Sequence, residues 1–524
     1  MQFPKIYNTY FVAMTATIGG ALFGFDISSM SATIGTEQYT TYFNNPDSTQ
    51  QGGITAAMPG GSFVGSLLAG FVCDRIGRKS TIQFSCILWL IGSILCCAAQ
   101  NVAMLVVGRF VNGLCVGFTS SQVPVYLAEI SRHSVRGKVI VIQQLAIEWG
   151  ILIMYYLGYG LSYIQGTASF RILWGLQMIP ALILILMMPM LPESPRWLAS
   201  KDQWDECTEI LANVHAKGDR EDPAVIAEVL EIREIVELES GYGKGSYLAL
   251  LNKRNWKRTI VGVMAQVNQQ LSGANVMMYY VVYVFQMAGL SGEVNLIASS
   301  VQYIVMVVFT TPTMFYIDKI GRRPLLLGGS MGMAVFIFIV GGLLATYGKY
   351  IPSVGDNDNI HITLEGQFGP SRGVLVCSYL FTMVYALTLA PVCWVYAPEV
   401  FPLYIRSKGM AVATAGNWAM NFALAYYVPP AMDNIGYKTF IIFGVFCVAM
   451  FIHMFLTFPE TAQKTLEEID ELFSPGAPWA WKTRVGNSRI SQEEEEIRRG
   501  DPEKSTASNH IENSTSDEDV VQRI

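Results

Sequence analysis

Two nearly identical charged segments, "DRIGRK" at Asp74–Lys79 and "DKIGRR" at Asp318–Arg323, stand far apart in a chain of 524 residues. Each lies between long apolar runs, and each holds a glycine among basic side chains. Glycine permits the tight turn that a chain needs when it leaves one helix and enters the next. The same charged turn in the same apolar setting indicates two related halves.

The apolar runs are long enough to cross a membrane. The chain is 52% hydrophobic and only 15% charged, whereas a soluble domain carries about a quarter charged residues. A bilayer core of about 30 Å needs about 20 apolar residues in a helix. We predict an all-α membrane protein in the lipid bilayer, with twelve transmembrane helices near 9–30, 54–73, 81–99, 102–123, 139–161, 171–191, 258–288, 294–317, 324–346, 373–396, 408–430 and 437–458.

Two further signatures repeat after equivalent spans. "AEISRHSVRGK" holds Glu129 and Arg136, and "PEVFPLYIRSKG" holds Glu399 and Arg406, with seven residues from acid to arginine in both. "PESPR" at 192–196 and "PETAQ" at 459–463 follow the last span of each half. Three matched signatures predict two six-helix pseudo-repeats in one orientation, which is a common build of secondary transporters.

The polar segments complete the predicted organisation: a first half at 1–191, a helical linker at 192–256, a second half at 257–458 and a tail at 459–524. In the linker, Ile226, Val229, Leu230 and Val236 predict the apolar stripe of an amphipathic helix. The tail beyond about 484 is rich in Glu, Ser, Asn and Arg with few aromatics, a composition typical of disorder.

Basic residues set the orientation. Lys and Arg gather in the loops after the second, fourth, eighth and tenth spans, whereas the loop at 31–52 has none. Since short cytoplasmic loops carry the excess of Lys and Arg, both termini and the linker are expected in the cytoplasm. Met1–Asn8 lacks the basic region of a cleaved signal, so the first run is expected to remain as a span.

The repeated clusters also predict a latch of ion pairs. Arginines can pair with the matched acids and with helix C-terminal carbonyls, and so hold the cytoplasmic ends together while a site faces outward. The alternative is that these charges only set the topology. The predicted latch comprises Asp74, Arg75, Arg78, Glu129, Arg136, Glu193, Arg196, Asp318, Arg322, Arg323, Glu399 and Arg406.

From about 5 to 472 the sequence resembles the sugar-porter branch of the major facilitator superfamily, and most of all the fungal hexose and pentose (high-affinity glucose-type) transporters. The resemblance rests on "GGALFGFD" (19–26), "DRIGRK", "GR" (108–109), "PESPRWL" (192–198), "QQLSGANVMMYY" (269–280), "DKIGRR" and "NWAMNF" (417–422). It implies a plasma-membrane carrier of monosaccharides such as glucose or xylose, working by alternating access.

Amide side chains in the spans mark a candidate sugar site. An amide offers both donors and an acceptor to a hydroxyl, and polar groups at membrane depth face the bundle interior. The resemblance places Gln144, Gln269, Gln270, Asn275, Trp394 and Asn417 at sugar contacts, with Phe23, Ile147, Tyr279, Met306 and Trp418 as pocket wall or gate. The alternatives are that the amides join helices and that the tryptophans serve packing or interfacial anchoring.

The sequence departs from the resemblance at two places near this site. Met306 stands where the resemblance suggests an asparagine, and a thioether accepts hydrogen bonds only weakly, so we hypothesise that it favours pentoses. Leu389 and Ala390 replace the Trp-Gly of many fungal relatives. "PETAQ" also lacks the usual Lys-Gly ending of its motif.

Asp26 lies inside the first span, where a carboxylate is costly unless it is paired or protonated. Arg109 of the fourth span is the natural partner. Proton-coupled sugar porters carry an acid at the Asp26 position, so the resemblance implies symport with protons. A facilitative uniporter in which the pair is structural remains the alternative.

Other classes fit less well. The sequence shows no Gly-rich phosphate loop and no nucleophile with a base, so no enzyme is expected. Nine cysteines and five histidines are scattered without metal spacing, so no metal or cofactor is expected, and no basic stripe indicates nucleic acid. A non-transporting sugar sensor is a second alternative. Ser, Thr and Lys in the tail suggest kinases or the ubiquitin machinery as regulatory partners.

Overall fold

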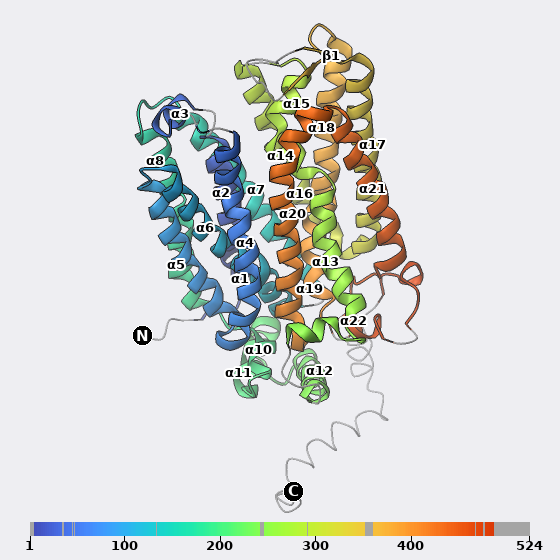
Figure 1. Ribbon diagram of the computed structural model, residues 1–524. Coiled ribbons are helices and arrows are strands. Elements are labelled where there is room, and N and C mark those ends of the chain that lie inside the picture. The colour runs from blue at the N-terminus through green and yellow to red at the C-terminus, as the bar shows by residue number, and fades with distance from the viewer. Residues whose placement is uncertain are drawn as a thin grey trace, which may run out of the picture.

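The computed structural model describes residues 5–33, 36–44, 46, 48–132, 134–240, 246–290, 292–351, 360–466, 468–474 and 477–486. Nearly all of the tail that was expected to be disordered lies outside these residues. The described chain forms two bundles of helices that stand side by side, with the linker helices below them (Figure 1).

The first half contains the first six spans. Its helices are α1 (Thr9–Ala16), α2 (Ile18–Ser31), α4 (Ser48–Ile76), α5 (Arg78–Cys97), α6 (Val102–Ile130), α7 (Arg136–Leu161), α8 (Ala168–Leu176) and α9 (Met178–Met187). The first span is α1 followed by α2, and the sixth is α8 followed by α9 and a 3-10 turn, η1 (Met188–Met190). A short helix, α3 (Glu37–Tyr42), lies in the loop after the first span.

The second half repeats this plan. Its helices are α13 (Trp256–Leu271), α14 (Ala274–Tyr279), α15 (Val281–Met287), α16 (Gly292–Ile320), α17 (Arg322–Tyr347), α18 (Phe368–Leu387), α19 (Leu389–Glu399), α20 (Arg406–Ile435) and α21 (Lys438–Thr457). Two short antiparallel strands, β1 (Lys349–Tyr350) and β2 (Ile362–Thr363), pair at its upper end. The smaller elements are η2 (Tyr247–Leu251), η3 (Leu403–Ile405), α22 (Glu468–Glu471) and η4 (Ala480–Lys482).

The twelve predicted spans are all helical. Among the described residues, ten helical segments are long and apolar enough to cross a membrane. The other two predicted spans are the seventh, which is α13–α15, and the eleventh, which is α20. The seventh is divided into helices that are each too short to cross a membrane alone, and both spans carry amide side chains of the candidate site.

Besides the first and sixth spans, whose interruptions keep a helical backbone, two spans are broken beside the candidate site. The seventh breaks at Gly273, whose φ of +83° suits glycine. The tenth breaks at Thr388 (φ −131°, ψ −90°), between α18 and α19. Irregular backbone at membrane depth is tolerated where it lines a cavity or is buried in protein, and these breaks lie beside the candidate site.

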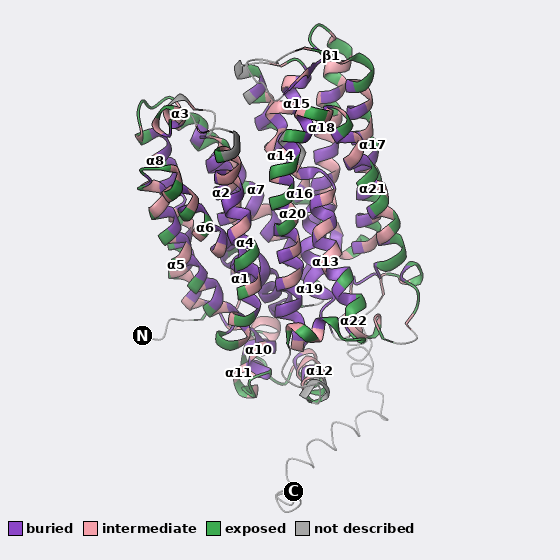
Figure 2. Cartoon of the chain, in the orientation of Figure 1, coloured by how far each residue is buried: buried purple, intermediate pink, exposed green. Residues whose placement is uncertain are grey.

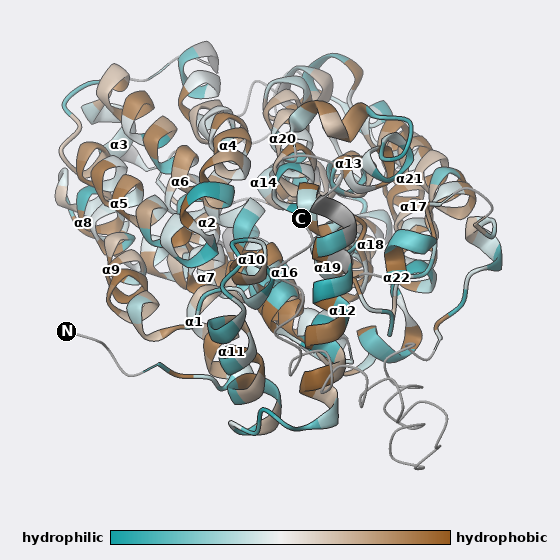
Figure 3. Cartoon of the chain, turned by 90° about the horizontal axis from the view of Figure 1, so that it is seen from below, coloured by the Kyte–Doolittle hydropathy of each residue, from teal (hydrophilic) through white to brown (hydrophobic). Residues whose placement is uncertain are grey.

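The linker forms α10 (Pro195–Ala199), α11 (Trp204–Ala216) and α12 (Pro223–Ser240). We call the end of the molecule that holds these helices and the two repeated turns the charged end. Hydrophilic residues are prominent on α10–α12 in the view from this end (Figure 3). The predicted stripe of α12 is partly wrong, because Val225 and Ile232 are buried while Ile226 and Leu230 are exposed.

The outer faces of the two bundles are apolar and exposed, as a lipid solvent requires. Leu68 and Phe71 on α4 and Leu182 and Leu186 on α9 are examples of exposed apolar side chains. Buried residues fill the space between the helices (Figure 2). The outer faces of the spans are therefore apolar, whereas their interior faces and their ends carry polar side chains.

Candidate functional site

A pocket opens between the two halves, beside the breaks in the seventh and tenth spans. Its walls come from α2 and α7 of the first half and from α13, α14, α16, α18, α19 and α20 of the second. The lining residues are Phe23, Ile27, Gln144, Ile147, Ile151, Gln269, Gln270, Asn275, Met278, Tyr279, Tyr303, Met306, Tyr385, Trp394 and Asn417. The structure thus brings together all six predicted sugar contacts and four of the five predicted wall residues.

Asn417 is the centre of an amide cluster in this pocket. Gln270 Nε2 donates to Asn417 Oδ1 over 2.8 Å, and Asn417 Nδ2 donates to Gln269 Oε1 over 3.0 Å and to Gln266 Oε1 over 2.9 Å. Asn275 Nδ2 in turn donates to Gln270 Oε1. The amides therefore join α13, α14 and α20 and line the pocket at the same time. Joining the helices and contacting a sugar, which the sequence offered as alternatives, are compatible.

The amide cluster forms one polar wall of the pocket, and hydrogen bonds already orient its side chains. Gln269 Nε2 is also held by the carbonyl of Ala390, over 3.0 Å, on the far side of the break in the tenth span. Each amide has two donor hydrogens and an acceptor oxygen with two lone pairs. Groups that are already oriented lose less conformational freedom when a polyhydroxylated ligand binds.

The two predicted tryptophans occupy different places. Trp394 lines the pocket. Trp418 is fully buried behind Phe23, with ring centroids 4.8 Å apart in an edge-to-face contact, and its Nε1 donates to Ser120 Oγ over 3.1 Å. Trp418 therefore packs α20 against α6 and supports the wall rather than forming it.

Sequence reasoning missed several lining residues. Ile27, Ile151, Met278, Tyr303 and Tyr385 also face the pocket. The position of Ile151, one turn after Ile147 on α7, was a signal in the sequence, because residues four apart share a helix face. The tyrosines gave no such signal, since aromatic residues are common throughout these spans.

Asp26 and Arg109 form the predicted buried pair. Arg109 Nη2 lies 3.1 Å from Asp26 Oδ2, and both side chains are almost fully buried between α2 and α6. Arg109 Nε also donates to the carbonyl of Ile54 on α4, over 2.9 Å. Arg109 thus compensates the negative charge of Asp26, and its bond to α4 anchors the guanidinium to a third helix.

Within the first half, the charged end is held by two acids. Arg78 Nε and Nη2 donate to Glu129 over 2.8 and 2.9 Å, a bidentate pair of the strong kind. Glu193 Oε1 accepts the backbone N–H groups of Arg78 and Lys79 at the start of α5. Burial is the main reason that the pKa of Glu193 lies above its ordinary value. Gly77, with φ +91°, forms the turn before α5.

The second half repeats these contacts. Arg322 Nη2 lies 2.9 Å from Glu399 Oε1. Glu460 accepts the backbone N–H groups of Arg322 and Arg323 at the start of α17, over 2.9 and 3.0 Å. Gly321, with φ +98°, forms the turn. Glu460 was not among the predicted latch residues, although its place in "PETAQ" matches that of Glu193 in "PESPR".

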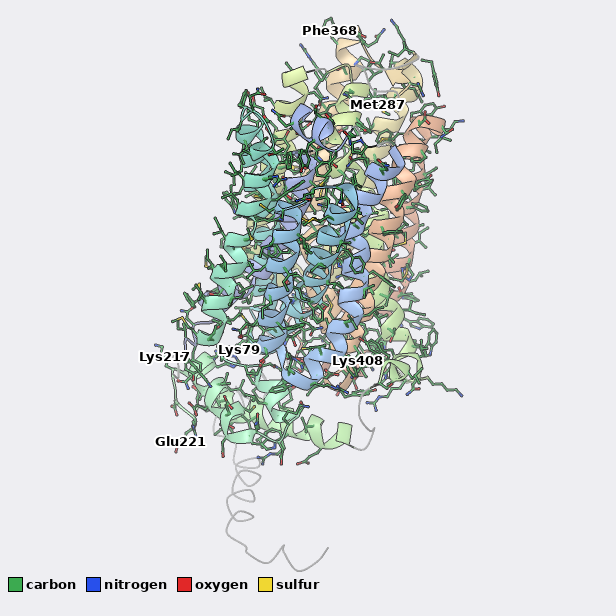
Figure 4. The ribbon with its side chains drawn as sticks, turned by 60° about the vertical axis from the view of Figure 1, so that its left-hand side comes forward. Lys79, Lys217, Glu221, Met287, Phe368 and Lys408 are labelled. Carbon is green, nitrogen blue, oxygen red and sulfur yellow. The ribbon has the colours of Figure 1, made fainter. Side chains whose placement is uncertain are left out.

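Several contacts cross between the halves at this end. Arg406 Nη1 lies 3.5 Å from Glu129 Oε1, and Arg136 Nη1 lies 3.9 Å from Glu399 Oε1. Asp318 Oδ1 accepts the N–H of Gly137 over 3.0 Å, and Lys408 pairs with Asp74. Lys79 and Lys408 lie at this end, far from Met287 and Phe368 at the other (Figure 4). Each repeat thus places its acids against the basic turn of the other repeat, and the charged end is closed.

Three predicted latch arginines have other contacts. Arg196 Nη1 donates to the carbonyl of Glu129 over 2.9 Å, and its Nη2 lies 3.5 Å from Glu228 of α12, so it ties the linker to α6. Arg323 donates to carbonyls at the end of α21. The Arg75 guanidinium lies 4.0 Å above the Phe71 ring and has no ion pair within the described residues.

The comparisons with known proteins agree with this architecture. The family described as "Sugar (and other) transporter" matches residues 12–473. The chain is 48% identical over 484 residues to a "High-affinity glucose transporter" of Kluyveromyces lactis, covering 92% of this chain and 88% of the relative. The chain therefore belongs to the sugar transporters of the major facilitator superfamily, with a twelve-helix membrane fold, and is a transporter rather than an enzyme.

The solved structures also inform the conformation. The proton:xylose symporter XylE bound to 6-bromo-6-deoxy-D-glucose superposes with a TM-score of 0.77 at 26% identity, over 89% of this chain and 99% of that one. The inward-open conformation of XylE from E. coli gives a TM-score of 0.64 at 26% identity, over 89% and 100%. The TM-score is lower for the inward-open conformation, which agrees with the closed charged end of this structure.

Proposed function

We propose that this transporter carries monosaccharides of the glucose or xylose type across the plasma membrane, in symport with protons and by alternating access. The observation that carries the proposal is the amide cluster around Asn417. It lies in a pocket between two halves whose charged ends are closed by cross-half ion pairs. A ligand in this pocket contacts both halves, so its binding can change the relative stability of their two arrangements.

The chemistry of the pocket suits a neutral sugar. The lining offers amide donors and acceptors, tyrosine hydroxyls and the Trp394 ring, and it holds no charged side chain among the described residues. Hydroxyl groups need such neutral partners, while a ring face packs on the C–H face of a pyranose. The names of the similar proteins, a glucose transporter and a xylose symporter with a bound glucose derivative, point to the same substrates.

Alternating access follows from the charged end. The excess of Lys and Arg there supports a cytoplasmic location for this end and for both termini. In this structure Glu129 and Glu399 each meet an arginine of the other half, so the pocket is closed toward the cytoplasm. These pairs must separate for the sugar to leave inward, and binding energy gained by closing the outer side offsets that cost.

Proton coupling is assigned to Asp26 and Arg109. The carboxylate is buried in the first span and lies 3.1 Å from its arginine. Protonation from the outside would remove its charge and free Arg109, and release inside would restore the pair. A facilitative uniporter, in which this pair is only structural, and a non-transporting sensor are the competing functions. Regulation of the tail by kinases or the ubiquitin machinery involves residues outside those described.

The test is uptake of radiolabelled glucose and xylose into proteoliposomes, with and without an inward proton gradient. We expect the wild type to accumulate sugar against its gradient, and Asp26→Asn only to equilibrate it. Equilibration by both proteins, regardless of the gradient, would show a uniporter. Absence of uptake by folded wild-type protein would favour the sensor.

A further inference from the structure

A second buried acid lies against the candidate sugar site. Glu148 stands one turn after Gln144 on α7 and is 1% exposed. Its Oε1 atom accepts from Gln144 Nε2 over 2.9 Å and from Thr310 Oγ1 of α16 over 2.8 Å. One carboxyl group therefore joins a pocket residue of the first half to a helix of the second half.

Glu148 differs from Asp26, Glu129 and Glu399 because it has no cationic partner. Within the described chain, no Lys, Arg or His lies within ion-pair distance of it, and Oε2 has no hydrogen-bond partner. Asp26 has Arg109, and Glu129 and Glu399 each have two arginines. A buried carboxylate without such a partner is expensive, so a proton on the vacant Oε2 is a chemically available state.

The neighbouring titratable groups do not supply the missing charge. On α2, α16 and α19, which pack against α7, these include Asp26, Tyr303 and Cys393. Tyr385 lies on α18, which packs against α16 and α19. Asp26 is engaged by Arg109, and Tyr303 donates to the carbonyl of Met278. Tyr385 is near enough to Glu148 for an electrostatic interaction. It carries no positive charge, so it cannot compensate the acid.

Thr310 connects this carboxyl to the break in the tenth span. Its single hydroxyl hydrogen has two acceptors within reach, Glu148 Oε1 at 2.8 Å and the carbonyl of Ala386 at 3.2 Å. Ala386 lies two residues before Thr388, where α18 ends. Further along α16, Tyr316 donates to the next carbonyl, that of Leu387, over 2.6 Å. The side chains of α16 thus hold the broken segment.

We propose that Glu148 is a proton-dependent positioning residue that links the sugar site to the break in the tenth span. Unprotonated, it holds Gln144 and draws the Thr310 hydroxyl, because hydrogen bonds to an ionised acceptor are the stronger ones. A proton taken onto Oε2 from the open side of the pocket removes the charge. Gln144 is then freer to bond a sugar hydroxyl, and Thr310 turns to the carbonyl of Ala386.

The proposal rests on the proposed function in one respect, which is that Gln144 contacts the sugar. Its test is equilibrium exchange of glucose in proteoliposomes, on the acid and the alkaline side of neutral pH and without a gradient. All variants carry Asp26→Asn, so that the other buried acid does not titrate. Glu148→Gln keeps an acceptor without the ionisation, and Glu148→Val removes both. Glu365→Gln, at an exposed acid outside the pocket, is the matched control.

We expect KM to change with pH in the Asp26→Asn parent and in the Glu365→Gln control. Glu148→Gln should show the same KM at both pH values. Glu148→Val should raise KM about tenfold, because Gln144 is then no longer positioned and the sugar itself must order that side chain. Thr310→Val should lower the maximal rate more than it raises KM, because it touches the break and not the sugar.

A pH-dependent KM in Glu148→Gln, or equal KM values in Glu148→Gln and Glu148→Val, would overturn the proposal. An unchanged maximal rate in Thr310→Val would overturn the link to the break. Failure of the parent and the wild type to exchange any sugar would instead overturn the proposed function, and the proposal with it.

Discussion

Arg406 reaches from the second half to Glu129 of the first: its Nη1 atom, at the start of α20, lies 3.5 Å from Glu129 Oε1, at the end of α6. Glu129 already binds Arg78 of its own half in a bidentate pair. The contact with Arg406 is therefore additional, and it exists only while the charged ends lie together. It reports the conformation of the molecule directly.

Arg406→Gln should open the charged end. Loss of one partner of a buried hydrogen-bonded group costs about 1–3 kcal/mol, so the inward-open population should rise about tenfold or more. Spin labels at Arg75→Cys and Lys319→Cys, both exposed positions on opposite halves, measure the distance by pulsed electron resonance once the partly exposed Cys97 and Cys377 are replaced by serine. A distance distribution identical to that of the labelled parent would contradict a latch.

Gly77→Ala and Gly321→Ala should each destabilise the fold. Both glycines have φ above +90°, and an added Cβ would meet the carboxylates of Glu193 and Glu460. The expected cost is about 1–3 kcal/mol for a strained backbone, seen as a lower unfolding temperature in detergent. Gly328→Ala on α17, where an added Cβ meets nothing within 4 Å, is the control. If all three variants had the same unfolding temperature, the two turns would not require glycine.

Trp394 and Trp418 should respond differently to substitution. Trp394→Ala removes a ring from the pocket and should raise the sugar KM about tenfold, which corresponds to about 1.4 kcal/mol and is the size expected for one aromatic contact. Trp418→Phe loses the bond to Ser120 Oγ but keeps a ring behind Phe23, so KM should change by less than about threefold. The measurement is the concentration dependence of uptake. A larger KM change in Trp418→Phe would reverse the assignment.

Met306→Asn should raise the ratio of glucose to xylose uptake. Met306 lines the pocket and is 1% exposed, so an amide there offers a donor and an acceptor to the hydroxymethyl arm that a pentose lacks. One such hydrogen bond is worth about 1 kcal/mol, or about fivefold in the ratio. Met306→Leu keeps the apolar volume and should leave the ratio unchanged. An equal ratio in both variants would remove Met306 as a specificity residue.

Much of this architecture could be predicted from the sequence because the membrane simplifies the problem. Runs of about 20 apolar residues fix the spans, and the matched turns at Asp74–Lys79 and Asp318–Arg323 fix the repeat. The amides could be selected because they are rare in apolar spans. The pairing of Asp26 with Arg109 could be predicted because a buried charge requires a partner.

The remaining features were missed for different reasons. Gln266 stands three and four residues before Gln269 and Gln270, so it shares their face of α13, and this helical spacing was a signal that the selection of amides overlooked. Half of the predicted stripe of α12 was wrong: Val229 and Val236 do pack on the linker core, but with Val225 and Ile232 instead of Ile226 and Leu230, because a helix rich in Val, Ile and Leu permits more than one apolar face. Glu148 was overlooked because its partners, Gln144 and Thr310, are neutral and the second lies on a distant helix.

The most direct test of the amide cluster as the sugar site is glucose counterflow into proteoliposomes by Asn417→Ala, beside the wild type and Asn434→Ala, an exposed asparagine of the same helix. We expect a transient overshoot of label in the wild type and in Asn434→Ala. In Asn417→Ala the overshoot should be lost, or should need at least about tenfold more glucose, since three glutamines lose their common partner. An overshoot in Asn417→Ala with the wild-type concentration dependence would contradict the central claim.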